Sequence, residues 1–147
     1  MSATAPGADA AAGPAIFSLP MPVRWRDMDA FGHVNNAAYL GYVEEARVAW
    51  FRALTPDWDG AAAAPIMAAV TMNYRRPITW PAAVVVELHA ERIGTKSLTV
   101  GHRVIDAGDE AVVYADGHTV LVWVDRAGAT VARPAVVREA CGATPPP

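Results

Sequence analysis

Cysteine is almost absent from this chain, because Cys141 is the only one in 147 residues. A single cysteine excludes an intrachain disulfide and any metal site built from cysteines. It lies in a segment rich in proline, glycine and alanine, where no neighbouring residue would hold a catalytic base. The chain length suits one domain that buries roughly 68–70% of its unfolded surface, so the core needs neither a disulfide nor a metal.

Positive charge and long apolar runs are also scarce. Lys96 is the only lysine, and a net charge of -3 disfavours nucleic acid as a partner, because nucleic acid attracts a basic face. The apolar run AAAAPIMAAV contains Pro65 and is shorter than the ~18 residues of a membrane-spanning helix. The N-terminus lacks the basic and apolar regions of a signal peptide. We therefore expect a cytoplasmic protein that does not insert into a membrane.

Common catalytic motifs are missing as well. None of the three serines lies in the G-x-S-x-G motif of serine hydrolases, and neither a P-loop nor a dinucleotide-binding fingerprint occurs. The histidines lack the i, i+4 spacing of a zinc-binding helix. His89, His102 and His118 fall in apolar, strand-like stretches and are interpreted as ordinary strand residues.

Residues 37–54 form the one pattern that predicts a long helix. Apolar residues recur at spacings of three and four, and the apolar stripe is broad, so this helix should be largely enclosed. Asn35 or Asn36 is suited to cap its start, because an asparagine side chain accepts from a free backbone N–H of the first turn. Pro56 should end it.

Strand-like runs occupy residues 17–27, 67–75, 83–93, 97–106 and 111–125, with residues 61–65 expected as a loop or a short helical turn. This order predicts an α+β fold, in which a curved antiparallel sheet of about five strands wraps around one central helix. Val, Tyr and Trp occur on both parities of residues 111–125, so the outer face of the sheet should need cover from a second copy. A single domain is expected at 16–138, between disordered tails at 1–15 and 139–147.

The stretch RDMDAFGHVNN places two carboxylates just before the predicted helix. The free N–H groups and the dipole of a helix start favour negative charge, whether on Asp29 or on an oxyanion that forms from a substrate carbonyl. One carboxylate and one oxyanion hole suffice for a thioester, whose thiolate leaves readily, but hardly for an amide. Asp29 could equally be a turn or capping residue.

The same stretch resembles the motif of the hot-dog-fold acyl-CoA thioesterases, the 4-hydroxybenzoyl-CoA thioesterase-like superfamily. The resemblance runs from about residue 20 to 125 and includes NYRRPI and ERIGTKSLTV. The residues that match the motif are Asp27, Asp29, Gly32, His33, Val34, Asn35, Asn36, Tyr39, Leu40, Glu44, Ala46 and Arg47.

The resemblance implies a role for particular residues. Asp29 would be the catalytic carboxylate, as general base or nucleophile, and backbone N–H groups around Asn35 and Asn36 would polarise the thioester carbonyl, with His33 nearby. Coenzyme A, as part of the substrate and not a separate cofactor, would contact basic residues and a neighbouring serine. These residues are Arg75, Arg76, Arg92, Lys96 and Ser97.

The resemblance also implies a homodimer with two sites at the subunit interface, often paired again into a tetramer. Two functions are therefore weighed. One is hydrolysis of a fatty or aromatic acyl-CoA, or of an acyl group on acyl carrier protein, which shares the pantetheine arm. The other is binding of an acyl thioester without useful turnover. A pocket that reaches Asp29 would favour the hydrolase, and one filled by Trp25, Phe31 or Met28 would favour the binding protein.

Overall fold

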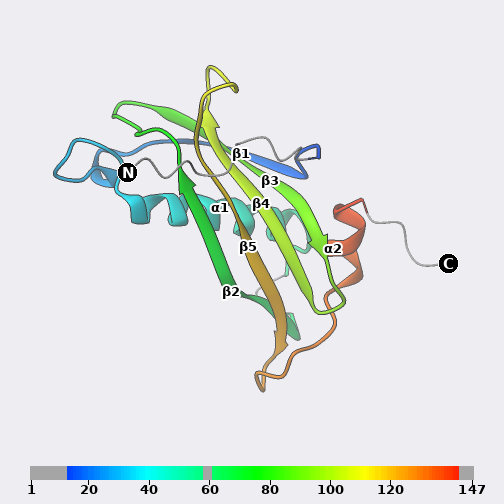
Figure 1. Ribbon diagram of the computed structural model, residues 1–147. Helices are drawn as coiled ribbons and strands as arrows, with labels where there is room; N and C mark the ends of the chain where they lie inside the picture. The colour runs from blue at the N-terminus through cyan, green and yellow to red at the C-terminus, as the bar shows by residue number, and fades with distance from the viewer. Residues whose placement is uncertain (1–12, 58–60, 143–147) are drawn as a thin grey trace, which may run out of the picture.

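The computed structural model describes residues 13–57 and 61–142, which form one antiparallel sheet and two helices (Figure 1). The described elements are β1 (Phe17–Pro22), a 3-10 helix (Trp25–Asp27), α1 (Asn36–Leu54), β2 (Ala63–Tyr74), β3 (Ala83–Ile93), β4 (Ser97–Asp106), β5 (Val113–Asp125) and α2 (Ala135–Ala140). The five strands lie in the order β1-β3-β4-β5-β2, and every neighbouring pair is antiparallel. The predicted α+β class and the five-stranded sheet are confirmed.

Helix α1 begins where the sequence predicts. The side chain of Asn35 accepts a hydrogen bond from the backbone N–H of Ala37 at 2.8 Å, so Asn35 is the cap. The helix ends at Leu54, two residues before Pro56. Its buried residues occupy a broad face, as predicted, and they are Tyr39, Tyr42, Val43, Ala46, Arg47, Trp50 and Phe51.

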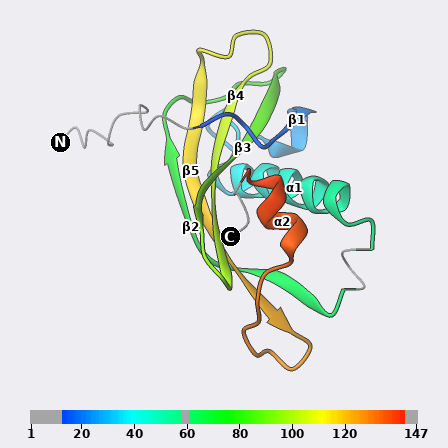
Figure 2. The ribbon, with the colours of Figure 1, turned by 90° about the vertical axis from the view of Figure 1, so that its right-hand side faces the viewer.

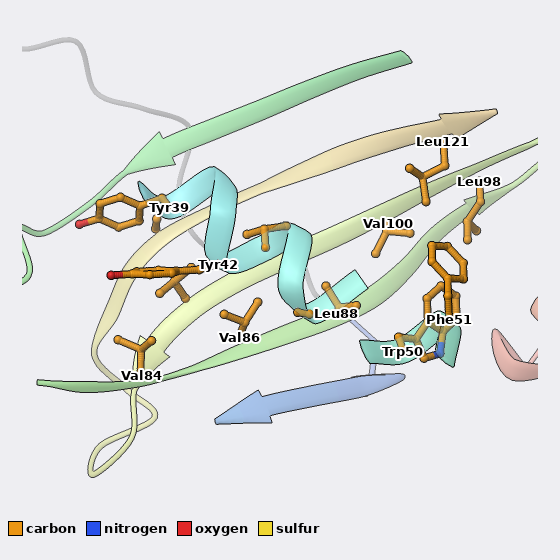
Figure 3. Close-up of a cluster of buried hydrophobic side chains, with 14 of the residues drawn as sticks. Tyr39, Tyr42, Trp50, Phe51, Val84, Val86, Leu88, Leu98, Val100 and Leu121 are labelled. Carbon is orange, nitrogen blue, oxygen red and sulfur yellow. The ribbon is translucent and has the colours of Figure 1, made fainter. Parts of the chain in front are cut away.

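The core lies between α1 and the concave face of the sheet (Figure 3). Val84, Val86 and Leu88 of β3 alternate toward the helix and are fully buried. Figure 2 shows α1 and α2 on the same side of the sheet. Burial of these apolar side chains stabilises the fold by about 25 cal/mol per Å² of apolar surface, and it fixes the helix along the sheet.

The opposite face of the sheet is more polar than predicted. Glu87, Arg103, Asp116 and Asn73 stand side by side on four neighbouring strands. Arg103 donates to Glu87 at 3.0 Å, and Asn73 donates to Asp116 at 3.0 Å. The prediction of an apolar outer face is therefore wrong along this row. Elsewhere on β5 it agrees with the structure, because Val120, Val122 and Val124 alternate with the buried Leu121 and Trp123.

Two predicted segments differ from the structure. The strand expected at 17–27 ends at Pro22 and is followed by a 3-10 helix, because the chain must turn there to reach α1. The loop expected at 61–65 is wrong from Ala63 onward, since β2 begins there and pairs with the far end of β5. Alanine and proline have little strand propensity of their own, and this register overrides it.

The chain ends are described only in part. Residues 1–12 and 143–147, where tails are predicted, lie outside the described residues. Helix α2, which the sequence patterns did not indicate, spans the predicted domain boundary at 138 and ends beside Cys141. Within residues 13–57 and 61–142, neither helix combines the length and the apolar character that a membrane crossing requires.

Candidate active site

A tight turn joins the 3-10 helix to α1 and positions Asp29. The backbone N–H of Asp29 donates to the carbonyl of His33 at 2.8 Å, and the N–H of Gly32 donates to the carbonyl of Asp29 at 3.1 Å. Gly32 has a φ of 76°, which favours glycine because a side chain would be strained there. The turn closes with an isolated bridge between Met28 and Val34.

The carboxylate of Asp29 has one oxygen fixed and one open. Its Oδ1 accepts the backbone N–H of Phe31 at 2.8 Å, so Asp29 does serve as a turn residue. Among the described residues, no donor bonds its Oδ2. The two interpretations of Asp29 are therefore compatible, because the bond that holds the turn also orients the second oxygen.

The start of α1 leaves one backbone donor open beside this turn. The N–H of Asn35 donates to the carbonyl of Asp27 at 2.8 Å. The next N–H groups that are engaged belong to Ala37 and Ala38, both bonded to Asn35. The N–H of Asn36 has no acceptor within the described part of the chain, and an α-helix cannot supply one at its first position. It is therefore an open backbone donor at the start of the helix.

Asp29 and Asn36 line the same pocket, which has a volume of about 400 Å³. Its walls come from the segment that includes the turn and the first turn of α1, and from the end of β2 and the residues after it. The lining residues are Asp29, Phe31, His33, Val34, Asn36, Tyr39, Tyr74, Arg75, Arg76 and Pro77. The Tyr74 hydroxyl donates to the carbonyl of Asn36 at 2.9 Å, which joins the end of β2 to the helix start.

The first acid of the stretch, Asp27, holds this region together. Its Oδ2 accepts the Tyr42 hydroxyl at 2.7 Å and the Arg24 backbone N–H at 2.9 Å. Burial raises the pKa of Asp27, but these hydrogen bonds and the Arg24 charge outweigh burial and hold the pKa below its usual value. Burial and the Asp27 carboxylate raise the pKa of Tyr42 far above its ordinary value, so both groups stay in one protonation state near neutral pH.

Sequence reasoning did not assign Asp27 and Tyr42 to a pair. They are 15 residues apart and meet only because the 3-10 helix folds back onto the second turn of α1. The available signal in the sequence was Tyr42 itself, which lies on the same helical face as Tyr39.

The predicted basic residues lie in two groups. Arg75 and Arg76 line the pocket, but Arg75 is held by Asp116, with its Nε 2.9 Å from Oδ2 and its Nη2 3.0 Å from Oδ1. Arg76 is exposed. Arg92, Lys96 and Ser97 lie near the turn between β3 and β4, at the end of β3 remote from Val23 and the Asp29 turn. An 11-residue strand spans about 35 Å, so a single copy of the chain does not bring these groups together.

The histidines predicted to be strand residues do lie on β3, β4 and β5, away from the pocket. His102 is 2% exposed, and burial, with the nearby Arg47 charge, lowers its pKa to about 4. It is therefore neutral near pH 7. In the part of the chain that the structure describes, no group of three or more His, Cys, Asp or Glu side chains is arranged to hold a metal ion.

A curved five-stranded sheet around one helix, with a carboxylate turn at the helix start, is the architecture of hot-dog-fold thioesterases. The chain belongs to the thioesterase-like superfamily, whose family model matches residues 23–141. This membership supports thioester hydrolase activity.

Individual relatives agree with this assignment. The PA2801 protein of Pseudomonas aeruginosa is 44% identical, and the match covers 86% of this chain and 98% of that one with a TM-score of 0.82. A thioesterase from Thermus thermophilus, solved with coenzyme A and Zn, is 34% identical, with 86% and 92% covered and a TM-score of 0.74. The long-chain acyl-CoA thioesterase FadM of Escherichia coli strain K12 is 29% identical over 115 residues, which are 70% of this chain and 79% of FadM.

Proposed function

We propose that the protein hydrolyses an acyl-coenzyme A thioester to the free acid and coenzyme A. The observation that carries this proposal is the pocket that Asp29 and Asn36 line together, with one carboxylate oxygen and one backbone N–H that no described residue engages. Coenzyme A in the Thermus thermophilus structure and the activity named for FadM support this substrate class.

The proposed hydrolysis needs only the Asp29 carboxylate, the Asn36 N–H and water. In one route Asp29 removes a proton from water as the water oxygen attacks the thioester carbon. The oxyanion that forms is bound by the Asn36 N–H, and the C–S bond then breaks. The sulfur leaves as thiolate, since a thiol has a pKa near 8.5, and takes up the proton. In the other route Oδ2 of Asp29 attacks the carbon, the C–S bond breaks and coenzyme A leaves as thiolate. Water then hydrolyses the resulting anhydride to the free acid and the Asp29 carboxylate, and the thiolate takes up the proton that water releases.

The remaining predicted residues have supporting roles in this proposal. Asn35 fixes the first turn of the helix through its side chain and so positions the Asn36 N–H. His33 lines the pocket and accepts the Asp29 N–H through its carbonyl. Its side chain is exposed at the pocket wall, where it can contact the substrate.

The pocket also bears on the alternative of a binding protein without turnover. Trp25 is 72% exposed and does not line the pocket. Phe31 lines the pocket but is 85% exposed, so most of its ring faces solvent and does not fill the space in front of Asp29. Met28 packs against the hydrophobic core. An accessible carboxylate beside an open backbone donor supports hydrolysis over binding alone.

The substrate can be identified with a panel of thioesters. Fatty acyl-CoAs of increasing length, an aromatic acyl-CoA and the same acyl groups on acyl carrier protein would be compared by the release of free thiol. We expect the highest kcat/KM for one class of acyl-CoA. A higher value for the carrier-protein form would move the proposal to that alternative, and no release from any thioester would contradict hydrolysis.

Arg76 is expected to bind coenzyme A phosphate. Replacing it with alanine should raise KM by roughly 10-fold and leave kcat nearly unchanged, which is the pattern of lost uniform binding. Arg75→Ala is the matched control, because its guanidinium is already bonded to Asp116 and it should raise KM less. Steady-state kinetics would check both, and an unchanged KM in Arg76→Ala would exclude this role.

We further propose that the protein is a homodimer, and a dimer of dimers where the dimers pair again. β2 is an edge strand, and its Ile66 and Met67 are about half exposed, which leaves backbone and apolar groups for a second copy. Light scattering should give at least twice the chain mass at micromolar concentration. A stable monomer would contradict the assembly.

A further inference from the structure

An aromatic and basic patch lies beside the pocket and has no part in the chemistry above. It consists of Arg24, Trp25, Arg26 and Trp80. Trp25 is 72% exposed and Trp80 is 46% exposed, and their rings meet edge to face with centroids 5.4 Å apart. Two neighbouring indoles are rarely exposed together on a protein surface. Exposed apolar patches of this kind commonly mark binding sites.

The patch is built on the two segments that form the pocket. The N–H of Val23 donates to the carbonyl of Ala82 at 2.9 Å, and the N–H of Val34 donates to the carbonyl of Ile78 at 2.9 Å. Between these bonds, one segment carries Trp25 and then Asp29, and the other carries Trp80. Pro77, which lines the pocket, directly precedes the second segment. Asp29 is four positions after Trp25, which is at most about 14 Å of chain.

The two arginines leave positive charge at the patch. Arg26 is exposed and has no ion pair within the described residues. Arg24 forms an ion pair with Asp27, whose Oδ1 is 3.6 Å from the Arg24 Nε, and its side chain is 51% exposed. Arginine binds phosphate through two parallel N–H donors, and an indole face binds a flat base by stacking.

We propose that this patch binds the adenosine 3′-phosphate 5′-diphosphate end of coenzyme A, with the base on the indoles and with Arg24 and Arg26 joining Arg76 of the pocket in holding the three phosphates. The inference rests on the proposed acyl-CoA substrate and places its nucleotide end. The patch is within reach of a pantetheine arm whose thioester lies at Asp29. Arg92 and Lys96 of the same subunit lie near the other end of the sheet and are out of that reach.

The test compares Trp25→Ala and Arg26→Ala with the unaltered protein on two substrates. One substrate is an acyl-CoA, and the other is the N-acetylcysteamine thioester of the same acyl group, which lacks the nucleotide. Each variant should raise KM for acyl-CoA roughly 10-fold, given the usual worth of base stacking. The kcat for acyl-CoA should stay unchanged, and so should both kcat and KM for the N-acetylcysteamine thioester. Arg52→Ala, an exposed arginine near the far end of α1, is the control and should alter neither.

Calorimetry with adenosine 3′,5′-bisphosphate gives a readout that needs no turnover. The unaltered protein should bind it, and Trp25→Ala should bind at least roughly 10-fold more weakly. Equal binding by both proteins, or a KM that rises equally on both substrates, would overturn the nucleotide site. An inactive protein that still loses nucleotide binding in Trp25→Ala would overturn the proposed hydrolysis and not this site.

Discussion

The Asp29→Asn variant should lose kcat by roughly 10²–10⁴-fold, the usual worth of a positioned base. Asparagine removes the charge, the basicity and the nucleophile of the side chain. It keeps an oxygen that can accept the Phe31 N–H, the 2.8 Å bond that holds the turn. The fold should therefore survive, and acyl-CoA should still bind, because the groups that bind its acyl and phosphate parts are other residues.

Kinetics and thermal unfolding on the same preparation would check this result. A turn residue without a catalytic role would give the opposite pattern, with a lower melting temperature and an unchanged kcat in the protein that stays folded. Full activity in folded Asp29→Asn would move the chemistry to another acid or leave only the binding protein.

Asp27→Asn should mainly lose stability, with a much smaller effect on kcat. The Asp27 carboxylate is buried and accepts hydrogen bonds from the Tyr42 hydroxyl and the Arg24 N–H. Hydrogen bonds to a charged group contribute about 1.5–3 kcal/mol, so we expect a loss in that range at pH 7. Urea unfolding followed by tryptophan fluorescence would measure it.

The contribution of Asp27 to the free energy of unfolding should depend on pH with a definite sign. The pKa of Asp27 is lowered in the folded protein, so its carboxylate contributes stability above its unfolded pKa, and this contribution is lost as the pH falls through the folded pKa. The difference in unfolding free energy between Asp27→Asn and the unaltered protein should therefore shrink in acid. A difference that stays constant or grows there, or a kcat loss larger than that of Asp29→Asn, would show that Asp27 has been assigned the wrong role.

Local chemistry explains which elements were predictable. The cap at Asn35 and the stop near Pro56 set the ends of α1 within one residue of the prediction. The strand-like runs at 83–93 and 97–106, bounded by turn signals such as Gly94, predicted β3 and β4 with their observed bounds. The start of β2 was not predictable, because Pro65 lies in a strand only through its pairing with Trp123, 58 positions away.

The candidate site also has a part that local sequence predicts and a part that depends on distant strands. Asp29 and Asn36 are seven residues apart, so a turn before a capped helix was enough to place them together. The arrival of Tyr74 at the carbonyl of Asn36 depends on the register of a distant strand. The ion pair between Arg75 and Asp116 depends on the same register, and no local pattern indicates it.

Thiol release by the unaltered protein, measured beside its binding of a thioether analogue of the same acyl-CoA, tests the central claim most directly. The analogue has no carbonyl that can be cleaved, so it reports binding alone. The proposal predicts that the protein binds the analogue and releases free coenzyme A from the thioester over many turnovers. Tight binding of the analogue with no thiol release above the uncatalysed rate would contradict hydrolysis at Asp29.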